Sequence, residues 1–220
     1  PSYDLNTYYQ NYEALSKDKS SPLWNRALMS TYEPGSTMKP AIAAAGLEEG
    51  VITETSKFYC SHIYRQFTDT TFKCLGSHGW IDVKNALNQS CNIYFYETGR
   101  LLGINRMNDY CTRFGLGQKT GVEINESSGV LAGIAYREAH GGTWYPGDTV
   151  QAAIGQSDNL FTPIQLCSYV STIANGGTRY RAHFVKSVKS SDYSETLLSN
   201  DGVVLNETGV SQNSIRIVKE

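Results

Sequence analysis

The stretch from position 37 to position 50, TMKPAIAAAGLEEG, constrains the fold of this chain more than any other. Its alanines favour a helix, and Pro40 falls in the first turn, where a missing backbone N–H does no harm. Gly50 can end the helix, because glycine readily adopts the left-handed conformation that follows a last turn. An alanine-rich helix with few polar groups is usually buried and tightly packed. The sequence therefore predicts a core helix over residues 37–49.

Ser36 and Lys39 stand at the entrance of this helix. Positions three apart share a helix face, so the two side chains can meet. Burial and the positive end of the helix dipole both lower the pKa of a lysine, and a neutral lysine can take the proton of a serine. The backbone N–H of Ser36 would help to hold an oxyanion. The pair is predicted to be an acyl-transfer nucleophile and its base. The alternative is a lysine that only extends from a core helix toward water.

A second Ser-x-x-Lys sequence, from Ser16 to Lys19, shows that this spacing alone is a weak signal. It lies in a charged stretch with no apolar helix behind it. We therefore interpret that copy as exposed surface.

Four further segments carry helix signals. The segment GWIDVKNALNQSCNIYFYETGRLLG, residues 79–103, predicts a short helix, a turn at QSCN and a second helix. Thr162 and Pro163 predict the start of another helix, which Gly176 and Gly177 end. Residues 6–15 and the final SQNSIRIVKE are also expected to be helical, whereas RAHFVKSVKS, residues 181–190, alternates like a strand.

Composition excludes two classes of partner. The net charge of the 220 residues is -2 and no cluster of lysines and arginines stands out, which argues against nucleic acid. No apolar run approaches the roughly 20 residues that a membrane helix needs.

The five cysteines give a mixed signal. None forms a Cys-x-x-Cys pair, so no structural zinc site is expected. Cys60 and Cys74 flank a polar stretch and form either a disulfide, in an oxidising compartment, or two free thiols. Cys167 is expected to be a small core residue.

The string YEPGSTMKP around Ser36 resembles the nucleophile motif of class B penicillin-binding proteins, the transpeptidases that cross-link bacterial peptidoglycan. The similarity continues through HGWIDVKNALNQSCNIYFYETGRLLG, FGLGQKTGVEI and WYPGDTVQAAIGQSDNLFTPIQL. It implies an α/β (α+β) fold of the β-lactamase and transpeptidase type, with an antiparallel sheet flanked by helices and an all-helical subdomain. Residues 1–220 would form one partial domain: a nucleophile helix at 36–50, helices from about 80 to 175, and a return toward the sheet at 178–220.

The family has three motifs, and literal matches to two of them mislead here. The second motif lies in a turn between two helices, a setting that Ser90-Cys91-Asn92 has, whereas 157–159 (SDN) precedes a Thr-Pro helix start. The third lies on a strand, whereas 119–121 (KTG) follows FGLGQ directly in a Gly-rich loop. The third motif is therefore not found, and we expect the chain to be a piece of a transpeptidase domain, cut at both ends, with an incomplete sheet. Such a piece would be marginally stable, swap strands or need further strands.

The resemblance implies a role for four residues. Ser36 attacks the carbonyl between the terminal D-alanines of a stem peptide, and Lys39 takes its proton. Ser90 relays a proton to the departing D-alanine, while Asn92 binds the substrate amide and orients Lys39. No metal or organic cofactor is implied, and Cys91 is expected to point into the helical core.

The same resemblance names the partners. They are peptidoglycan stem peptides, β-lactam antibiotics and the cell-wall synthesis machinery. The expected location is the extracytoplasmic face of the bacterial membrane, reached through an anchor outside this chain.

Three alternatives remain. One is a β-lactamase or β-lactam sensor of the same fold. A class A hydrolase needs a Glu that is followed four residues later by Asn, and this sequence has none. A class D enzyme has an apolar residue at the position of Asn92, which argues against that class. The second is a non-catalytic scaffold module, and the third is an unrelated α/β domain with chance motifs.

Overall fold

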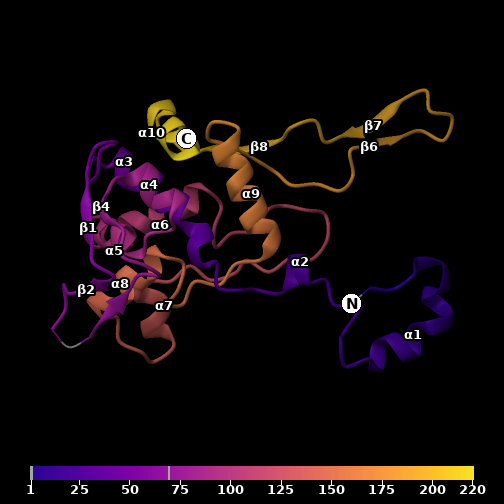
Figure 1. The fold of residues 1–220 in the computed structure, drawn as a ribbon. Coiled ribbons are helices and arrows are strands. Elements are labelled where there is room, and N and C mark those ends of the chain that lie inside the picture. The colour runs from indigo at the N-terminus through magenta and orange to yellow at the C-terminus, as the bar shows by residue number, and fades with distance from the viewer. Residues whose placement is uncertain (1, 69) are drawn as a thin grey trace.

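The computed structural model describes residues 2–68 and 70–220. At the centre lies helix α3 (Lys39–Glu48), in which every residue from Ala41 to Gly46 is buried. Helices α4 (Val83–Asn88), α5 (Asn92–Leu102), α6 (Ile104–Arg113) and α10 (Gln212–Lys219) contact it (Figure 1). The predicted core helix is confirmed, and Gly50 follows it with φ +66°.

The first turn of this region differs from a plain α-helix. Residues Gly35–Met38 form a 3-10 turn, η2, that leads directly into α3. Pro40 lies within the first two positions of α3, as its missing N–H requires.

The helices around Ser90 also form as expected. The Asp82 side chain accepts the backbone N–H of Asn85 at 3.0 Å and so caps α4, and the turn that follows leads into α5. Helix α8 (Pro146–Ala153) packs closely on α5 at Gly99, where a Cβ atom would lie 2.4 Å from that of Ala153. Only glycine permits this approach of the two helices.

Helix α9 (Pro163–Ala174) begins with a capping box, in which Thr162 and Gln165 satisfy each other's backbone N–H groups. The start and end of this helix were predicted correctly, but the burial of Cys167 was not. Cys167 is exposed. The buried face of α9 carries Gln165 and Tyr169, and position 167 falls between them on the other face.

Among the residues that the structure describes, the strands form four two-stranded antiparallel sheets. They pair β1 (Phe58–Cys60) with β4 (Gly79–Ile81), β2 (Ile63–Tyr64) with β3 (Phe72–Lys73), β5 (Thr178–Tyr180) with β8 (Val204–Glu207), and β6 (Ser187–Lys189) with β7 (Thr196–Ser199). The strand predicted over 181–190 is found only at its end. Phe184 and Val185 instead donate their backbone N–H groups to the carboxylate of Glu123. These N–H groups are therefore not available for pairing with a neighbouring strand.

The other elements are the 3-10 turn η1 (Leu5–Thr7), α1 (Tyr8–Lys17), α2 (Arg26–Met29) and α7 (Ile134–Ala139). Figure 1 shows that α1 and the β6–β7 hairpin each project from the helical body. Among the described residues, no helix combines the length and the hydropathy needed to cross a membrane.

Candidate active site

The turn that carries Ser36 is held in place by two distant elements. The N–H of Gly35 donates to the carbonyl of Gly155 at 2.9 Å, and the hydroxyl of Tyr169 donates to the carbonyl of Thr37 at 2.5 Å. Gly155 has φ +75°, and a Cβ atom there would lie 2.2 Å from the carbonyl oxygen of Gly35. The nucleophile turn is therefore positioned by a contact that only glycine allows.

Ser90 lies directly opposite Ser36. It follows α4 with φ +52°, an unusual conformation for a residue with a side chain. Its Oγ donates a hydrogen bond of 2.8 Å to the Oγ of Ser36. This left-handed turn brings together two hydroxyls that lie 54 positions apart in the sequence.

Lys39 is 1% exposed, and its Nζ donates three hydrogen bonds. The acceptors are the backbone oxygen of Ser90 at 2.8 Å, the Oγ of Ser90 at 3.0 Å and the Oδ1 of Asn92 at 2.7 Å. Burial lowers the pKa of Lys39 to about 8, although the nearby thiols of Cys74 and Cys91 act in the opposite direction. A lysine near pKa 8 has an appreciable neutral population at physiological pH.

The three acceptors decide where a neutral Lys39 would place its lone pair. A neutral amine keeps two N–H groups. Of the three partners, only the Ser90 hydroxyl can also donate, because a carbonyl and an amide oxygen only accept. The neutral amine therefore directs its lone pair at the Oγ of Ser90.

Asn92 is the first residue of α5 and completes the set. Its Nδ2 donates to the carbonyl of Lys73 at 3.2 Å while its Oδ1 receives Lys39. All four site residues predicted from the sequence thus meet. In the part of the chain that the structure describes, however, no hydrogen bond joins Ser36 to Lys39 directly, and Ser90 lies between them.

The two segments whose letters match the family motifs, 157–159 and 119–121, have structural contacts. Asn159 is fully buried and accepts the backbone N–H of Ala132, while Asp158 pairs with Arg137 at 2.6 Å. Thr120 is buried against the carboxylate of Glu126 in a loop. These contacts agree with our interpretation of 157–159 and 119–121 as structural segments, and Ser16 and Lys19 are exposed, as expected.

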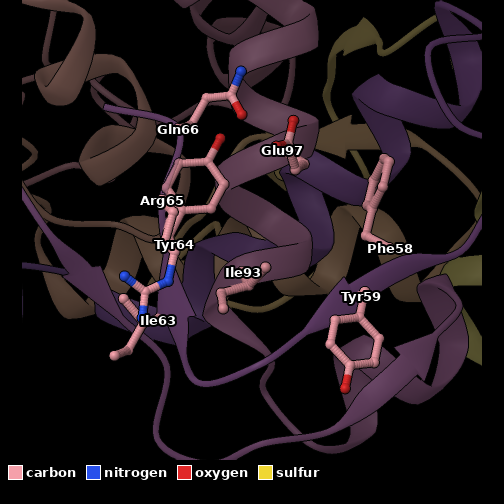
Figure 2. Close-up of a pocket in the computed structure, with 8 residues that line it drawn as sticks. All are labelled: Phe58, Tyr59, Ile63, Tyr64, Arg65, Gln66, Ile93 and Glu97. Carbon is pink, nitrogen blue, oxygen red and sulfur yellow. The ribbon is translucent and has the colours of Figure 1, made fainter. Parts of the chain in front are cut away.

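A cavity of about 250 Å³ lies on another part of α5 (Figure 2). Its lining combines apolar and polar side chains: Phe58, Tyr59, Ile63, Tyr64, Arg65, Gln66, Ile93 and Glu97. None of the four site residues lines this cavity.

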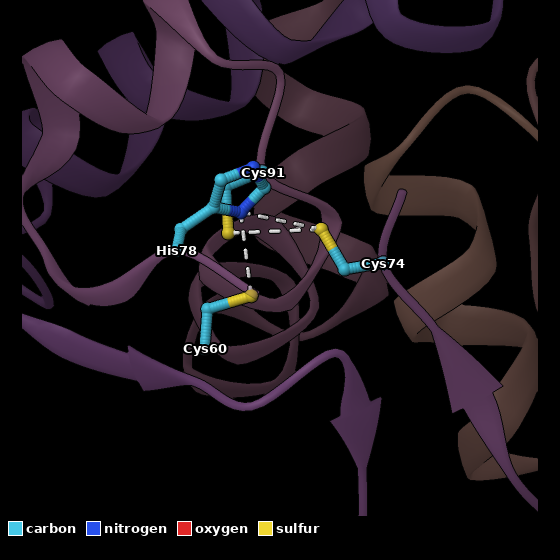
Figure 3. Close-up of side chains that lie close together, drawn as sticks. All are labelled: Cys60, Cys74, His78 and Cys91. Atoms are coloured by element: carbon cyan, nitrogen blue, oxygen red, sulfur yellow. Dashed lines mark hydrogen bonds between the residues drawn. The ribbon is translucent and has the colours of Figure 1, made fainter. Parts of the chain in front are cut away.

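A second cluster of side chains includes Cys91, the residue that follows Ser90 in the turn. One ligand atom each from Cys60, Cys74, His78 and Cys91 lies within 4.8 Å of the others (Figure 3). All five cysteines are free thiols, the second of the two alternatives for Cys60 and Cys74. The expectation of no structural zinc site rested on the missing Cys-x-x-Cys spacing and did not consider this cluster, in which the fold adds Cys60 and Cys91 to the nearby pair Cys74 and His78.

The model of the penicillin-binding protein transpeptidase domain matches residues 1–220. The chain belongs to this family. This transpeptidase domain is 34% identical over 203 residues to the peptidoglycan D,D-transpeptidase MrdA of Salmonella typhimurium strain SL1344, which covers 86% of this chain and 32% of that protein. The chain therefore spans about a third of the length of that curated relative.

Two solved structures support the same assignment of fold. PBP2 of Pseudomonas aeruginosa in complex with WCK 5153 matches with a TM-score of 0.85 and 31% identity, over 99% of this chain and 51% of that one. The imipenem acyl-enzyme of penicillin-binding protein A from M. tuberculosis matches with a TM-score of 0.83 and 24% identity, again over 99% and 51%, which is a likeness of fold alone. The transpeptidase-like α/β fold expected from the sequence is confirmed.

Proposed function

We propose that this chain carries the acyl-transfer centre of a peptidoglycan D,D-transpeptidase, with Ser36 as the nucleophile. The observation that carries the proposal is the unbroken chain of hydrogen bonds from Ser36 through Ser90 to the buried Lys39. A serine needs a base that removes its proton, and a desolvated lysine is one of the groups that can do so.

In the acylation step, the Oγ of Ser36 forms a bond to the carbonyl carbon between two D-alanines. Its proton passes to the Oγ of Ser90, whose own proton passes to the Nζ of Lys39. The tetrahedral intermediate then collapses, the C–N bond breaks, and the proton passes from Lys39 through Ser90 to the leaving amine of D-alanine. Ser90 is thus a relay in both directions, and the backbone N–H of Ser36 is predicted to help hold the oxyanion.

Asn92 is proposed to bind the substrate. Its Oδ1 holds Lys39, and one N–H of its Nδ2 is used by Lys73. The second N–H remains for the carbonyl of the substrate amide.

The acyl-enzyme is resolved by the amine of a neighbouring stem peptide. That amine attacks the ester carbon and gives up a proton, which passes through Ser90 to Lys39. When the bond to Ser36 breaks, this proton returns through Ser90 to the Oγ of Ser36. A β-lactam imitates the D-alanine terminus and is expected to remain on Ser36. No cofactor takes part in the proposed route.

The proposed setting follows from the relatives. MrdA is named as a peptidoglycan transpeptidase, so we infer that stem peptides are the substrates and that the cell-wall synthesis machinery is the partner. Cross-linking joins stem peptides of the assembled wall, so we infer that the site acts at the extracytoplasmic face of the membrane.

The test is the intact mass of the full-length protein after incubation with a penicillin. A covalent adduct is expected on the wild type and on Ser16→Ala, which removes the serine of the exposed Ser-x-x-Lys copy. The adduct should be lost in Ser36→Ala. Equal adducts on both variants would show that Ser36 is not the nucleophile, and no adduct on the wild type would favour a non-catalytic scaffold.

A further inference from the structure

We propose that Arg137 is a positioning residue for Ser36. It binds one end of the turn formed by residues 155–158, here called the supporting turn, and the other end of that turn contacts the nucleophile turn. The effect of Arg137 on acylation rests on the proposed function, whereas the coupling of the two turns does not. The proposal also gives a role to Ser157 and Asp158, which match a family motif by letter but lie outside the acyl-transfer centre.

The supporting turn is joined to the nucleophile turn by its first residue. The carbonyl of Gly155 accepts the N–H of Gly35 at 2.9 Å, and Gly35 is the neighbour of Ser36. Further along the chain, Phe161 and Tyr32 exchange two backbone hydrogen bonds of 2.9 Å each. The chain that leads to Ser36 therefore lies against the segment that begins at Gly155. A displacement of this segment would move the backbone of the nucleophile.

The far end of the supporting turn has a conformation that its surroundings must hold. Ser157 has φ +63°, a left-handed conformation that is uncommon for a residue with a side chain and persists where neighbouring groups enforce it. The buried Nδ2 of Asn159 donates to the carbonyls of Ala152 at 3.2 Å and Gln156 at 3.1 Å. These bonds join the turn to the end of α8, but they involve neither the Ser157 nor the Asp158 side chain.

Arg137 contacts those two side chains from α7. Its Nε donates to the Oδ2 of Asp158 at 2.6 Å, and its Nη2 donates to the Oγ of Ser157 at 3.1 Å. The same Nη2 donates to the Oδ1 of Asp148, in the first turn of α8, at 3.3 Å. A guanidinium can make these bonds together because its N–H groups are fixed in a planar fork. One side chain thus joins two neighbouring residues of the supporting turn to α8.

The guanidinium is itself held by its neighbours. Its Cζ lies 5.4 Å from the centre of the Trp144 ring, a distance at which a cation and a ring attract each other. The Nε1 of Trp144 donates to the Oγ1 of Thr149 at 3.0 Å. A Cβ atom at Gly142 would lie 2.6 Å from the Cδ of Arg137, so the glycine leaves room for the arginine stem. A side chain locked in this way can fix the position of the groups that it binds.

A purely structural role for Arg137 would be the attachment of α7 to the protein. All six residues of this helix are exposed or partly exposed, so apolar burial holds it weakly. In that role, removal of Arg137 would loosen α7 and nothing else. A positioning role predicts more. Without the cation between them, the carboxylates of Asp148 and Asp158 repel each other, and the supporting turn moves away from the nucleophile turn.

The first experiment measures hydrogen exchange in the full-length protein and needs no substrate. In Arg137→Ala, the amide of Gly35 should exchange at least severalfold faster than in the wild type, because its acceptor on Gly155 is no longer held in place. Arg113→Ala is the matched control. Arg113 also pairs with an aspartate and lies over a tyrosine ring, but it does so on α6. The amide of Gly35 should exchange at the wild-type rate in this control.

The second experiment measures acylation by a fluorescent penicillin. Arg137→Ala should lower the maximal rate about tenfold, because a small misplacement of a nucleophile is costly. The penicillin concentration for half the maximal rate should change by less than about twofold. Arg137→Lys keeps the charge without the fork and should recover only part of the rate. Asp158→Ala should slow acylation as Arg137→Ala does, and the double variant should be no slower than the single ones, since both act through one turn.

Three results would overturn the proposal. The first is exchange of Gly35 at the wild-type rate in Arg137→Ala that circular dichroism shows to be folded. The second is an equal effect of Arg113→Ala. The third is a pair of losses, in Arg137→Ala and Asp158→Ala, that multiply in the double variant. If Arg137→Ala does not fold, Arg137→Lys and Asp158→Ala give the same comparison of exchange. A wild type that penicillin does not acylate would refute the proposed function and leave the exchange result as the test of this one.

Discussion

The buried amine of Lys39 should determine how acylation depends on pH. Desolvation favours the neutral form and lowers the pKa of Lys39 from 10.5 to about 8. At pH 7, about one lysine in ten would then be neutral, compared with about one in 3,000 without the shift, a difference of about 300-fold. Because the neutral form is the base, the acylation rate should rise about tenfold per pH unit below the pKa and level off above about pH 8.

The assay is the second-order rate constant for acylation by a fluorescent penicillin, measured from pH 6 to pH 9.5 on the full-length protein. Asn92→Asp puts a negative charge at an atom 2.7 Å from the Nζ of Lys39 and should move the midpoint upward by about 1–3 pH units. Asn88→Asp, at an exposed position of α4, is the matched control and should leave the midpoint unchanged.

A rate that does not change between pH 6 and pH 8, in protein that circular dichroism shows to be folded, would refute this reasoning. So would a midpoint near pH 10, because Lys39 would then behave like a lysine in water. Either result would require another base for Ser36.

Three further predictions concern the framework of the site. Gly155→Ala should slow acylation at least tenfold, since its Cβ would collide with the nucleophile turn; Gly141→Ala, also at positive φ but with nothing within 4 Å, should affect only stability. Tyr169→Phe removes the hydrogen bond to Thr37 and should lower stability by about 1 kcal/mol in urea unfolding, together with a slower acylation; an unchanged rate would mean that the turn holds its shape without it. Asp82→Ala removes the cap of α4 and should cost about 1 kcal/mol of unfolding free energy by the same measurement, with no loss expected if water replaces the carboxylate fully.

The helices that carry the site were predictable from local signals. Alanines behind Pro40 fixed α3, and Thr162 with Pro163 fixed the start of α9. The proximity of Ser36 and Lys39 was predicted from their spacing, whereas the hydroxyl of Ser90 between them was not. Local pattern therefore sufficed wherever a side chain and its partner lie on one helix or next to it.

Distant contacts could not be predicted in the same way. Tyr169 reaches Thr37 across 132 positions, and Gly155 meets the nucleophile turn through a backbone contact that leaves no pattern in the sequence. The burial of Cys167 was wrong because one apolar residue does not decide which face of α9 is inside. The short strands also escaped prediction, since two or three residues cannot show an alternation.

At the turn that contains Ser90, the sequence indicated Ser90 and Asn92 as site residues but did not indicate the cluster around Cys91. Ser90 and Asn92 contact Lys39, whereas Cys91, between them, is fully buried and its Sγ lies 3.9 Å from the Sγ of Cys74. The turn at Ser90 is therefore in contact with Lys39 on one side and with buried cysteines on the other. Ser36→Ala should abolish acylation and leave the midpoint of thermal unfolding nearly unchanged, because among the described residues its Oγ makes only one exposed hydrogen bond, to Ser90.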